Sequence, residues 1–250
     1  MENNFKKFKK TLRDAFFPLY YTCSVCKREV FDGSFLCNDC YETLFFNDGF
    51  RCEKCGRRTL GSVSSCPSCR LQRGVDKARS AFSYEGAIIP LIHNLKYSSA
   101  KYVACVLAPF LRDVYVKDFF SPDVLTFVPM SAKAEKSRGY NQSRLLAEEL
   151  AKLVDNEVIE TLIKTKDTKN QASLGYKERQ KNLEGCFRVS SVKAVKGKKI
   201  LLVDDVLTTG ATSDEAASAL KRAGAESVYL LTVASVPSHK DDTGEDEDDE

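Results

Sequence analysis

The chain has 250 residues, of which 43% are hydrophobic and 29% charged, with a formal net charge of +3. These values are ordinary for a soluble globular protein, and the length allows one large domain or a medium domain with a small appendage. The sequence contains no run of about 18 apolar residues, which excludes a membrane-spanning helix. The basic N-terminal stretch lacks the apolar core of a secretory signal, so we expect a cytoplasmic protein.

The first predicted element is an amphipathic basic helix within residues 1–20. Residues 5–16 place four hydrophobic side chains at helical spacing among lysines and an arginine. Pro18 would end this helix. The helix can dock on the rest of the protein, or it can make a peripheral contact with an anionic membrane or lie in a partner groove.

Eight of the ten cysteines form four CxxC pairs, with 10, 11 and 10 residues between consecutive pairs. A CxxC turn presents two thiolates to one metal ion, and two such turns complete the tetrahedral shell that suits zinc. Free thiols, disulfides and iron–sulfur ligation are the alternatives. The sequence predicts two structural Zn²⁺ ions in a double zinc ribbon over residues 21–75, ligated by Cys23, Cys26, Cys37, Cys40, Cys52, Cys55, Cys66 and Cys69.

Three expectations follow for the cysteines. Sequential pairing of the CxxC turns is the simplest ribbon topology, and interleaved pairing stays open. A site with four cysteine ligands has no open coordination position, so we assign it no catalytic role. The two remaining cysteines, Cys105 and Cys186, are expected to be buried thiols.

Beyond the cysteines, apolar periodicity predicts alternating strands and helices. We expect strands at 78–84, 124–128, 157–163, 199–203 and 227–234, and helices at 88–95, 102–114, 141–154 and 213–223. Such alternation implies an α/β fold, in which helices cover both faces of a mainly parallel sheet. The predicted domain spans residues 76–237. An acidic tail over 238–250 is expected to be disordered.

The most informative segment runs from Ile200 to Thr212. A buried strand leads to two adjacent carboxylates, Asp204 and Asp205, and a loop with hydroxyls and Gly210 precedes the next helix. Carboxylates accept hydrogen bonds from vicinal sugar hydroxyls, whereas N–H groups at a helix N-terminus bind a phosphate. The segment therefore predicts a sugar-phosphate site. We also expect Thr212 and Glu215 to form a capping box at the start of the helix.

This stretch resembles the motif by which type I phosphoribosyltransferases bind 5-phosphoribosyl 1-diphosphate (PRPP). The resemblance implies that Asp204 and Asp205 hold the ribose hydroxyls and that Mg²⁺ binds together with PRPP. It implies that the 5′-phosphate is held by Val206, Leu207, Thr208, Thr209, Gly210, Ala211 and Thr212.

Two further segments have counterparts in these enzymes. Lys136 and Arg138 follow the strand at 124–128, where the family contacts pyrophosphate, and the polar segment 165–182 stands where the family carries a flexible loop. Solvated surface is the alternative interpretation of both segments.

Residues 22–235 as a whole resemble the ComF (ComFC/GntX-like) branch of that superfamily. The resemblance rests on the double zinc ribbon, on Leu95-Lys96-Tyr97, on Arg138-Gly139-Tyr140-Asn141-Gln142, on Gln171, Arg179 and Asn182, and on the PRPP loop. It implies a role in natural competence and DNA uptake, with single-stranded DNA and a competence helicase as candidate partners.

Two main hypotheses for the function result. In the first, the protein is a phosphoribosyltransferase, a pentosyl glycosyltransferase that displaces pyrophosphate with Asp204, Asp205 and Arg138 as catalytic residues. In the second, it is a non-catalytic zinc-ribbon adaptor that binds single-stranded nucleic acid and senses PRPP; aromatic residues interleaved with basic ones near residues 10–21 fit such a surface. A structural zinc adaptor with a vestigial pocket is a third hypothesis. The acceptor substrate is not indicated.

Overall fold

The computed structural model describes residues 22–31, 34–70, 74–119, 121–166, 183 and 185–238. The helix predicted within residues 1–20 lies outside the described residues, as do residues 167–182 of the predicted polar segment and residues 239–250 of the predicted acidic tail. The chain divides into two compact units, residues 1–44 and 45–250. None of the described helices is long and apolar enough to cross a membrane.

The smaller unit contains the first two CxxC pairs. The turn after Cys23 is closed by a 2.7 Å hydrogen bond from its backbone N–H to the carbonyl of Arg28, and Lys27 adopts a positive φ of 63° within it. The second pair frames the short helix α2 (Asn38–Glu42). Little apolar material is buried here, so local turns and the cysteine ligands define this unit.

The larger unit is built on a five-stranded sheet with the order β1-β2-β7-β6-β3. Its strands are β1 (Leu44–Phe46), β2 (Lys77–Gly86), β3 (Val124–Phe127), β6 (Lys199–Leu207) and β7 (Ser227–Ser235). The pairs β2/β7, β7/β6 and β6/β3 are all parallel. The near-continuous burial of β6 and β7 is typical of strands that are covered on both faces.

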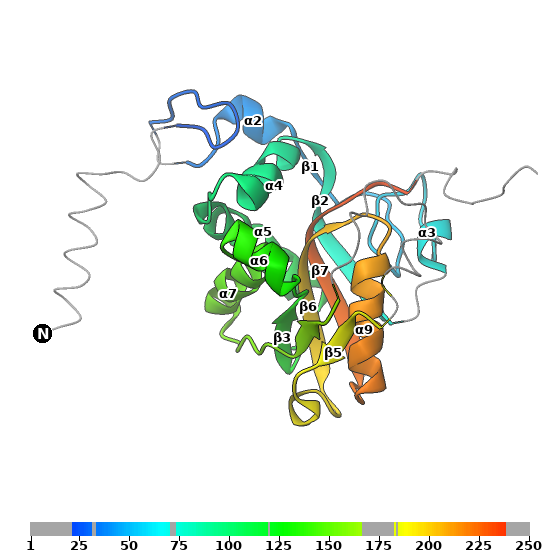
Figure 1. Ribbon diagram of the computed structural model, residues 1–250. Helices are drawn as coiled ribbons and strands as arrows, with labels where there is room; N and C mark the ends of the chain where they lie inside the picture. The colour runs from blue at the N-terminus through cyan, green and yellow to red at the C-terminus, as the bar shows by residue number, and fades with distance from the viewer. Residues whose placement is uncertain are drawn as a thin grey trace, which may run out of the picture. The chain divides into compact units, whose positions relative to one another are not determined.

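Helices cover both faces of this sheet, as Figure 1 shows. The helices α4 (Ile88–Tyr97), α5 (Tyr102–Asp118) and α7 (Gln142–Val154) pack on one face, and α9 (Ala211–Arg222) packs on the other. Leu146, Ala147 and Leu150 form the buried stripe of α7, at the spacing that the sequence indicates. The predicted α/β class with a mainly parallel sheet is confirmed.

The strand predicted at 157–163 is wrong for most of its length. Val158 makes a single parallel bridge to Leu125, and the chain then leaves the main sheet. β4 (Leu162–Lys164) pairs antiparallel with β5 (Phe187–Val189) in a separate two-stranded sheet. The hydroxyl of Thr161 contacts that of Thr126 at 2.8 Å, so side-chain bonding replaces further ladder pairing where the segments diverge.

Two local predictions are also corrected. α9 begins at Ala211 after Gly210, which adopts φ 85° and makes no side-chain cap, so Thr212 and Glu215 do not form a capping box at its start. The carboxylate of Glu215 instead accepts hydrogen bonds from Arg222 at 2.9 Å and from the backbone N–H of Gly185 at 3.2 Å. Cys186 is buried as expected, whereas Cys105 is exposed on α5.

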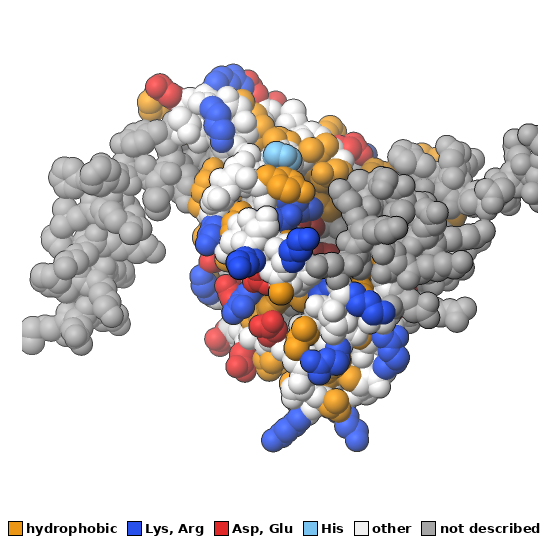
Figure 2. Space-filling view, viewed as in Figure 1, with side chains coloured by type: hydrophobic (Ala, Val, Ile, Leu, Met, Phe, Trp, Pro, Cys, Tyr) orange, Lys and Arg blue, Asp and Glu red, His pale blue; other side chains and the backbone are white. Residues whose placement is uncertain are grey.

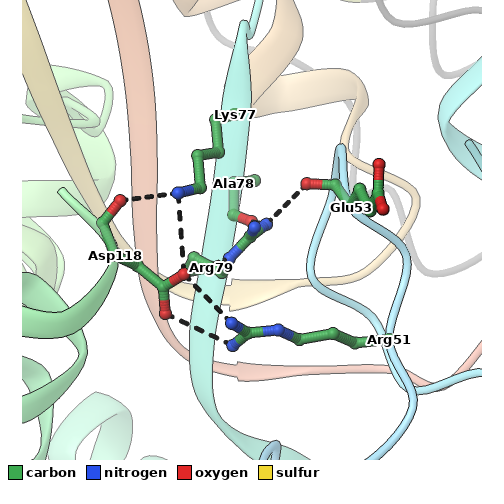
Figure 3. Close-up of polar contacts among 6 residues, drawn as sticks. All are labelled: Arg51, Glu53, Lys77, Ala78, Arg79 and Asp118. Carbon is green, nitrogen blue, oxygen red and sulfur yellow. Dashed lines mark hydrogen bonds and ion pairs between the residues drawn. The ribbon is translucent and has the colours of Figure 1, made fainter. Parts of the chain in front are cut away.

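A buried carboxylate, Asp118 at the end of α5, joins three cations from two distant segments (Figure 3). Its Oδ1 lies 2.9 Å from Arg79 Nε, 3.0 Å from Arg51 Nη2 and 3.6 Å from Lys77 Nζ. Arg79 also donates a 2.8 Å hydrogen bond to the carbonyl of Glu53. Burial would raise the pKa of Asp118, but the hydrogen bond from Arg79 and the neighbouring cations hold it below its ordinary value. The cluster fastens α5, β2 and the third CxxC turn together.

Replacing Asp118 by Asn should lower the free energy of unfolding at pH 7 by about 3 kcal/mol, because three cations lose their buried partner. The depressed pKa means that this stabilisation is present above the ordinary Asp pKa, near 4, and is lost as pH falls through the lower folded-state pKa. The deficit of the variant should therefore shrink in acid. Urea unfolding at pH 7 and below pH 4 measures it.

The matched control for this prediction is Asp113→Asn on the same helix. The Asp113 side chain is 64% exposed and pairs only with its neighbour Arg112 among the described residues. This variant should leave stability almost unchanged. Equal stability of the two variants would contradict the assigned role of Asp118.

Candidate functional site

A pocket of about 350 Å³ opens where β6 runs into α9. β6, the loop after it, the segment after β3 and the start of α7 all meet there, since the carboxyl ends of parallel strands share one edge of the sheet. The pocket is lined by Lys96, Val128, Pro129, Met130, Ser131, Ala134, Gln142, Ser143, Lys164, Asp204, Asp205, Val206, Thr208, Gly210, Thr212 and Ser213.

The two aspartates form the buried floor of this pocket. They lie inside β6, which continues to Leu207 and so extends beyond the predicted strand. The hydroxyl of Ser143 donates a 2.8 Å hydrogen bond to Asp204 Oδ1, which also accepts the backbone N–H of Asp205 at 2.9 Å. Lys96 Nζ lies 2.9 Å from Asp205 Oδ2. Each carboxylate therefore has its own partner from a helix on the same face of the sheet.

The carboxylate pair is electrostatically uneven. Burial, and then the charge of Asp205, raise the pKa of Asp204 to about 7, although the hydrogen bond from Ser143 and the charge of Lys96 oppose this rise. Burial would lower the pKa of Lys96, but the charge of Asp205, the hydrogen bond to Asp205 and the charge of Asp204 together outweigh it and raise that pKa. This pKa leaves Asp204 partly protonated near neutral pH, whereas Lys96 stays charged beside Asp205.

Residues 206–212, which comprise the end of β6, the connecting turn and the start of α9, are called the phosphate loop below. Of its residues, Val206, Thr208, Gly210 and Thr212 line the pocket, whereas Leu207 and Ala211 are buried in the core. Thr209 Oγ accepts a 3.4 Å hydrogen bond from the N–H of Ala211. The positive φ of Gly210 turns the chain into α9, so the pocket meets the N-terminal end of a 12-residue helix.

The basic residues predicted after β3, Lys136 and Arg138, do not line this pocket. The segment forms a short helix, α6 (Ala132–Arg138), which starts after Ser131 and presents Ser131 and Ala134 to the pocket. Lys136 is exposed and does not line the pocket. Arg138 lines a second, adjoining pocket that shares Lys96 and Ala134 with the first, and its guanidinium lies 5.1 Å from the ring of Tyr97. Figure 2 shows Lys and Arg side chains gathered over this region.

Several polar residues that line the pocket carry no predicted role in the sequence, among them Lys96, Ser143 and Lys164. Lys96 belongs to the stretch Leu95-Lys96-Tyr97, so a family pattern marks it. Its ion pair with Asp205 joins residues far apart in the chain and has no local signal. The sequence gives no signal for Ser143, which looks like an ordinary residue in the first turn of a helix. The Asn141 side chain caps this helix and accepts a 2.9 Å hydrogen bond from the Ser143 N–H.

The eight predicted ligand cysteines form two groups, and the pairing is sequential. Within each group the four ligand atoms lie within 4.8 Å of one another. In the second group, Cys52 to Cys69 and Cys55 to Cys66 are each 3.5 Å apart in Sγ–Sγ distance. Four sulfurs at the Zn–S bond length stand roughly 3.8 Å apart in a tetrahedron. Both groups therefore fit a zinc ion after only a small adjustment of their Sγ–Sγ distances.

The first group also has a cation beside it. Arg28 Nε lies 3.3 Å from Cys26 Sγ, and the Arg28 guanidinium lowers the pKa of this thiol to about 6. A thiol that ionises near neutral pH is prepared for metal ligation, because the thiolate is the ligand.

Comparison with known proteins agrees with this geometry. A family model described as phosphoribosyl transferase domain matches residues 141–249, and one described as double zinc ribbon domain matches residues 12–70. The DNA utilization protein YhgH of Escherichia coli K12 is 30% identical over 220 residues, which cover 83% of this chain and 94% of that protein.

Two further relatives carry competence in their names. Competence protein F of Haemophilus influenzae is 28% identical and covers 73% of this chain and 83% of its own length. Competence protein ComFC of Streptococcus pneumoniae is 29% identical, with 81% and 88% covered. With a double zinc ribbon, a phosphoribosyltransferase-type domain and a relative at 30% identity along nearly its whole length, the chain belongs to the ComF family of competence and DNA utilization proteins.

Proposed function

We propose that the pocket at the end of β6 binds PRPP together with Mg²⁺, and that the protein is a phosphoribosyltransferase-like protein that acts in DNA uptake or processing. The buried pair of Asp204 and Asp205 carries this proposal. Ser143 and Lys96 each occupy only part of the acceptor capacity of one carboxylate, and the vicinal 2′- and 3′-hydroxyls of ribose are two donors that can use the rest. The name of the Escherichia coli relative, DNA utilization protein YhgH, supports the connection with DNA.

The phosphate loop supports the other end of the same ligand. Its backbone N–H groups stand at the N-terminal end of α9, where the helix dipole favours an anion. Thr208 and Thr212 bring hydroxyls to the pocket, and Gly210 lets a ligand approach the backbone closely. The pocket thus combines groups that accept hydrogen bonds from sugar hydroxyls with groups that donate hydrogen bonds to a phosphate. A 5-phosphorylated ribose requires both.

The diphosphate of PRPP would extend toward Lys96, which lines both pockets, and toward Arg138 in the second one. Mg²⁺ would neutralise charge on the diphosphate and ribose oxygens. In the transfer reaction, the bond from ribose C1 to the diphosphate oxygen breaks and a bond from C1 to the acceptor nucleophile forms. Pyrophosphate departs with the bonding electron pair, and the acceptor releases a proton. Lys96 and Arg138 would stabilise the departing charge.

The double variant Asp204→Ala plus Asp205→Ala tests the proposal. It should abolish Mg²⁺-dependent binding of PRPP in calorimetric titration, because the ribose hydroxyls lose both acceptors. Zinc content should stay at two ions per chain, since the two cysteine groups contain neither aspartate. Loss of zinc together with PRPP binding would contradict this separation of roles.

A matched control is the double variant Glu148→Ala plus Glu149→Ala on α7. It also removes two adjacent carboxylates, which pair with Arg144 and Lys152 at the surface. This control should bind PRPP like the wild type. Absence of wild-type binding at millimolar PRPP would refute the proposed function.

PRPP binding should also depend on pH. Because burial and Asp205 raise the pKa of Asp204 to about 7, its carboxyl is protonated below that pH and loses acceptor capacity. The affinity for PRPP should therefore increase as pH rises from 6 to 8. Asp204→Asn should bind weakly with a flatter profile, and any slope it retains reports the ionisation of PRPP. Identical profiles for wild type and variant would exclude Asp204 as the titrating group.

The raised pKa of Asp204 also determines in which direction the free energy of unfolding changes with pH. A carboxyl with a raised pKa binds its proton more tightly in the folded state, so its contribution to the free energy of unfolding falls as pH rises from the ordinary Asp pKa, near 4, to about 7. The two windows overlap just below pH 7, where a rise in pH should both tighten PRPP binding and lower the stability of the apo-protein.

The smaller unit supports a second candidate function, the binding of single-stranded nucleic acid. Phe31 and Tyr41 are 84% and 49% exposed, and Lys27 and Arg28 are exposed in the same unit. Exposed rings among cations suit base stacking beside phosphate contacts. Phe31→Ala plus Tyr41→Ala should weaken binding of a labelled oligothymidylate at least tenfold in fluorescence anisotropy.

Two further measurements test this binding: its salt dependence reports the phosphate contacts, and a control variant tests whether the loss is specific to the rings. Affinity should fall steeply with salt in the wild type, since phosphate contacts release counterions. Leu60→Ala, which removes a 91% exposed hydrophobic side chain from the larger unit, should have no effect. Equal losses for both variants would remove the smaller unit as the binding surface.

A further inference from the structure

Arg57 places a buried guanidinium against the phosphate loop. It lies two residues after Cys55, a ligand of the second cysteine group, and its side chain is only 2% exposed. Nη2 donates a hydrogen bond to the backbone carbonyl of Thr208. Its Nε has no hydrogen-bond partner, and the guanidinium forms no ion pair with any carboxylate in the described part of the chain. A cation is thus buried directly at the loop without a carboxylate beside it.

The contact controls the direction of a peptide group in the loop. In a trans peptide, the C=O and the following N–H point in opposite directions. A donor that holds the Thr208 carbonyl therefore also fixes the direction of the Thr209 N–H. Since backbone N–H groups are the anion-binding groups of such a loop, their direction decides whether a phosphate can be held.

The backbone that carries Arg57 is itself rigidly held. Its carbonyl accepts the N–H of Cys52 at 2.9 Å, and the Lys54 carbonyl accepts the N–H of Ala78 from β2 at 2.8 Å. Gly56 packs so closely on β2 that a Cβ there would meet the Ala78 carbonyl at 2.7 Å. Arg79, within the cluster around Asp118, binds the Glu53 carbonyl in the same turn (Figure 3).

The charge of the second cysteine group adds a reason for a cation at this position. A zinc ion with four thiolates carries a net charge of −2, which disfavours a phosphate nearby. Arg57 follows the ligand Cys55 in sequence and presents positive charge to the loop. It offsets part of that negative charge where an anion would bind.

We propose that Arg57 is a positioning residue through which the second zinc site holds the phosphate loop ready for the 5′-phosphate. This inference rests on the proposed PRPP function and deepens it. It assigns the second ribbon a task beyond structural support, because zinc at that site fixes the turn that carries Arg57.

The test compares Arg57→Met and Arg57→Lys with Arg58→Met in the full-length, zinc-loaded protein. The side chain of Arg58 is exposed beside the same turn, so its variant is the matched control. Calorimetric titration with PRPP and Mg²⁺ should show binding weakened roughly tenfold or more for Arg57→Met, the size expected for a lost charged hydrogen bond. Arg57→Lys should recover part of the affinity, and Arg58→Met should bind like the wild type. Zinc content should remain at two ions per chain.

Hydrogen exchange, read without ligand, separates positioning from a general structural role. Arg57→Met should increase exchange in residues 205–212 while leaving β7 and the turns around Cys52 and Cys66 protected. Unchanged PRPP affinity with unchanged loop exchange would overturn the inference, as would loss of zinc or of protection throughout the unit. If the wild type binds no PRPP, the proposed function fails, and loop exchange alone then decides whether Arg57 positions the loop.

Discussion

The burial of two adjacent carboxylates in the interior strand β6 is the constraint on which the rest of the site depends. An unpaired buried carboxylate costs several kcal/mol, so the fold must bring partners to Asp204 and Asp205. Ser143 reaches the first from α7, and Lys96 reaches the second from α4. Both helices pack on one face of the sheet, which leaves the opposite side of the site to the phosphate loop and α9.

The two cysteine groups differ in their relation to this site. The second group belongs to the same hydrophobic core as the sheet and α9, together with Ala78, Leu207 and Ala211. The first group lies in the smaller unit and is defined mainly by its own turns. Two ribbons of similar sequence spacing therefore serve different surroundings. One is built into the core of the larger unit, and the other lies in the smaller unit, which has exposed aromatic and basic side chains.

Much of the fold follows from local pattern. The helices α4, α5 and α7 and the strands β2, β3, β6 and β7 were predictable because their apolar residues repeat at the helical or strand period over most of their length. The segment 157–163 shows where this reasoning fails, because its apolar residues fit a strand but the partner edge is available only at Val158. The start of α9 was missed because Gly210 turns the chain by backbone conformation and not by a side-chain cap.

The sequence by itself determined which residues could carry chemistry: the spacing of eight cysteines predicts two metal sites, and the segment from Asp204 to Thr212 predicts a sugar-phosphate site. Both signals are local, because each is carried by one continuous stretch of the chain. Only the tertiary structure decided the sequential cysteine pairing and the separation of Arg138 from the main pocket. It also decided the partners Lys96, Ser143 and Arg57. Those contacts join residues distant in sequence, and no local periodicity encodes them, because they depend on which strand edges and helix faces the packed core brings together.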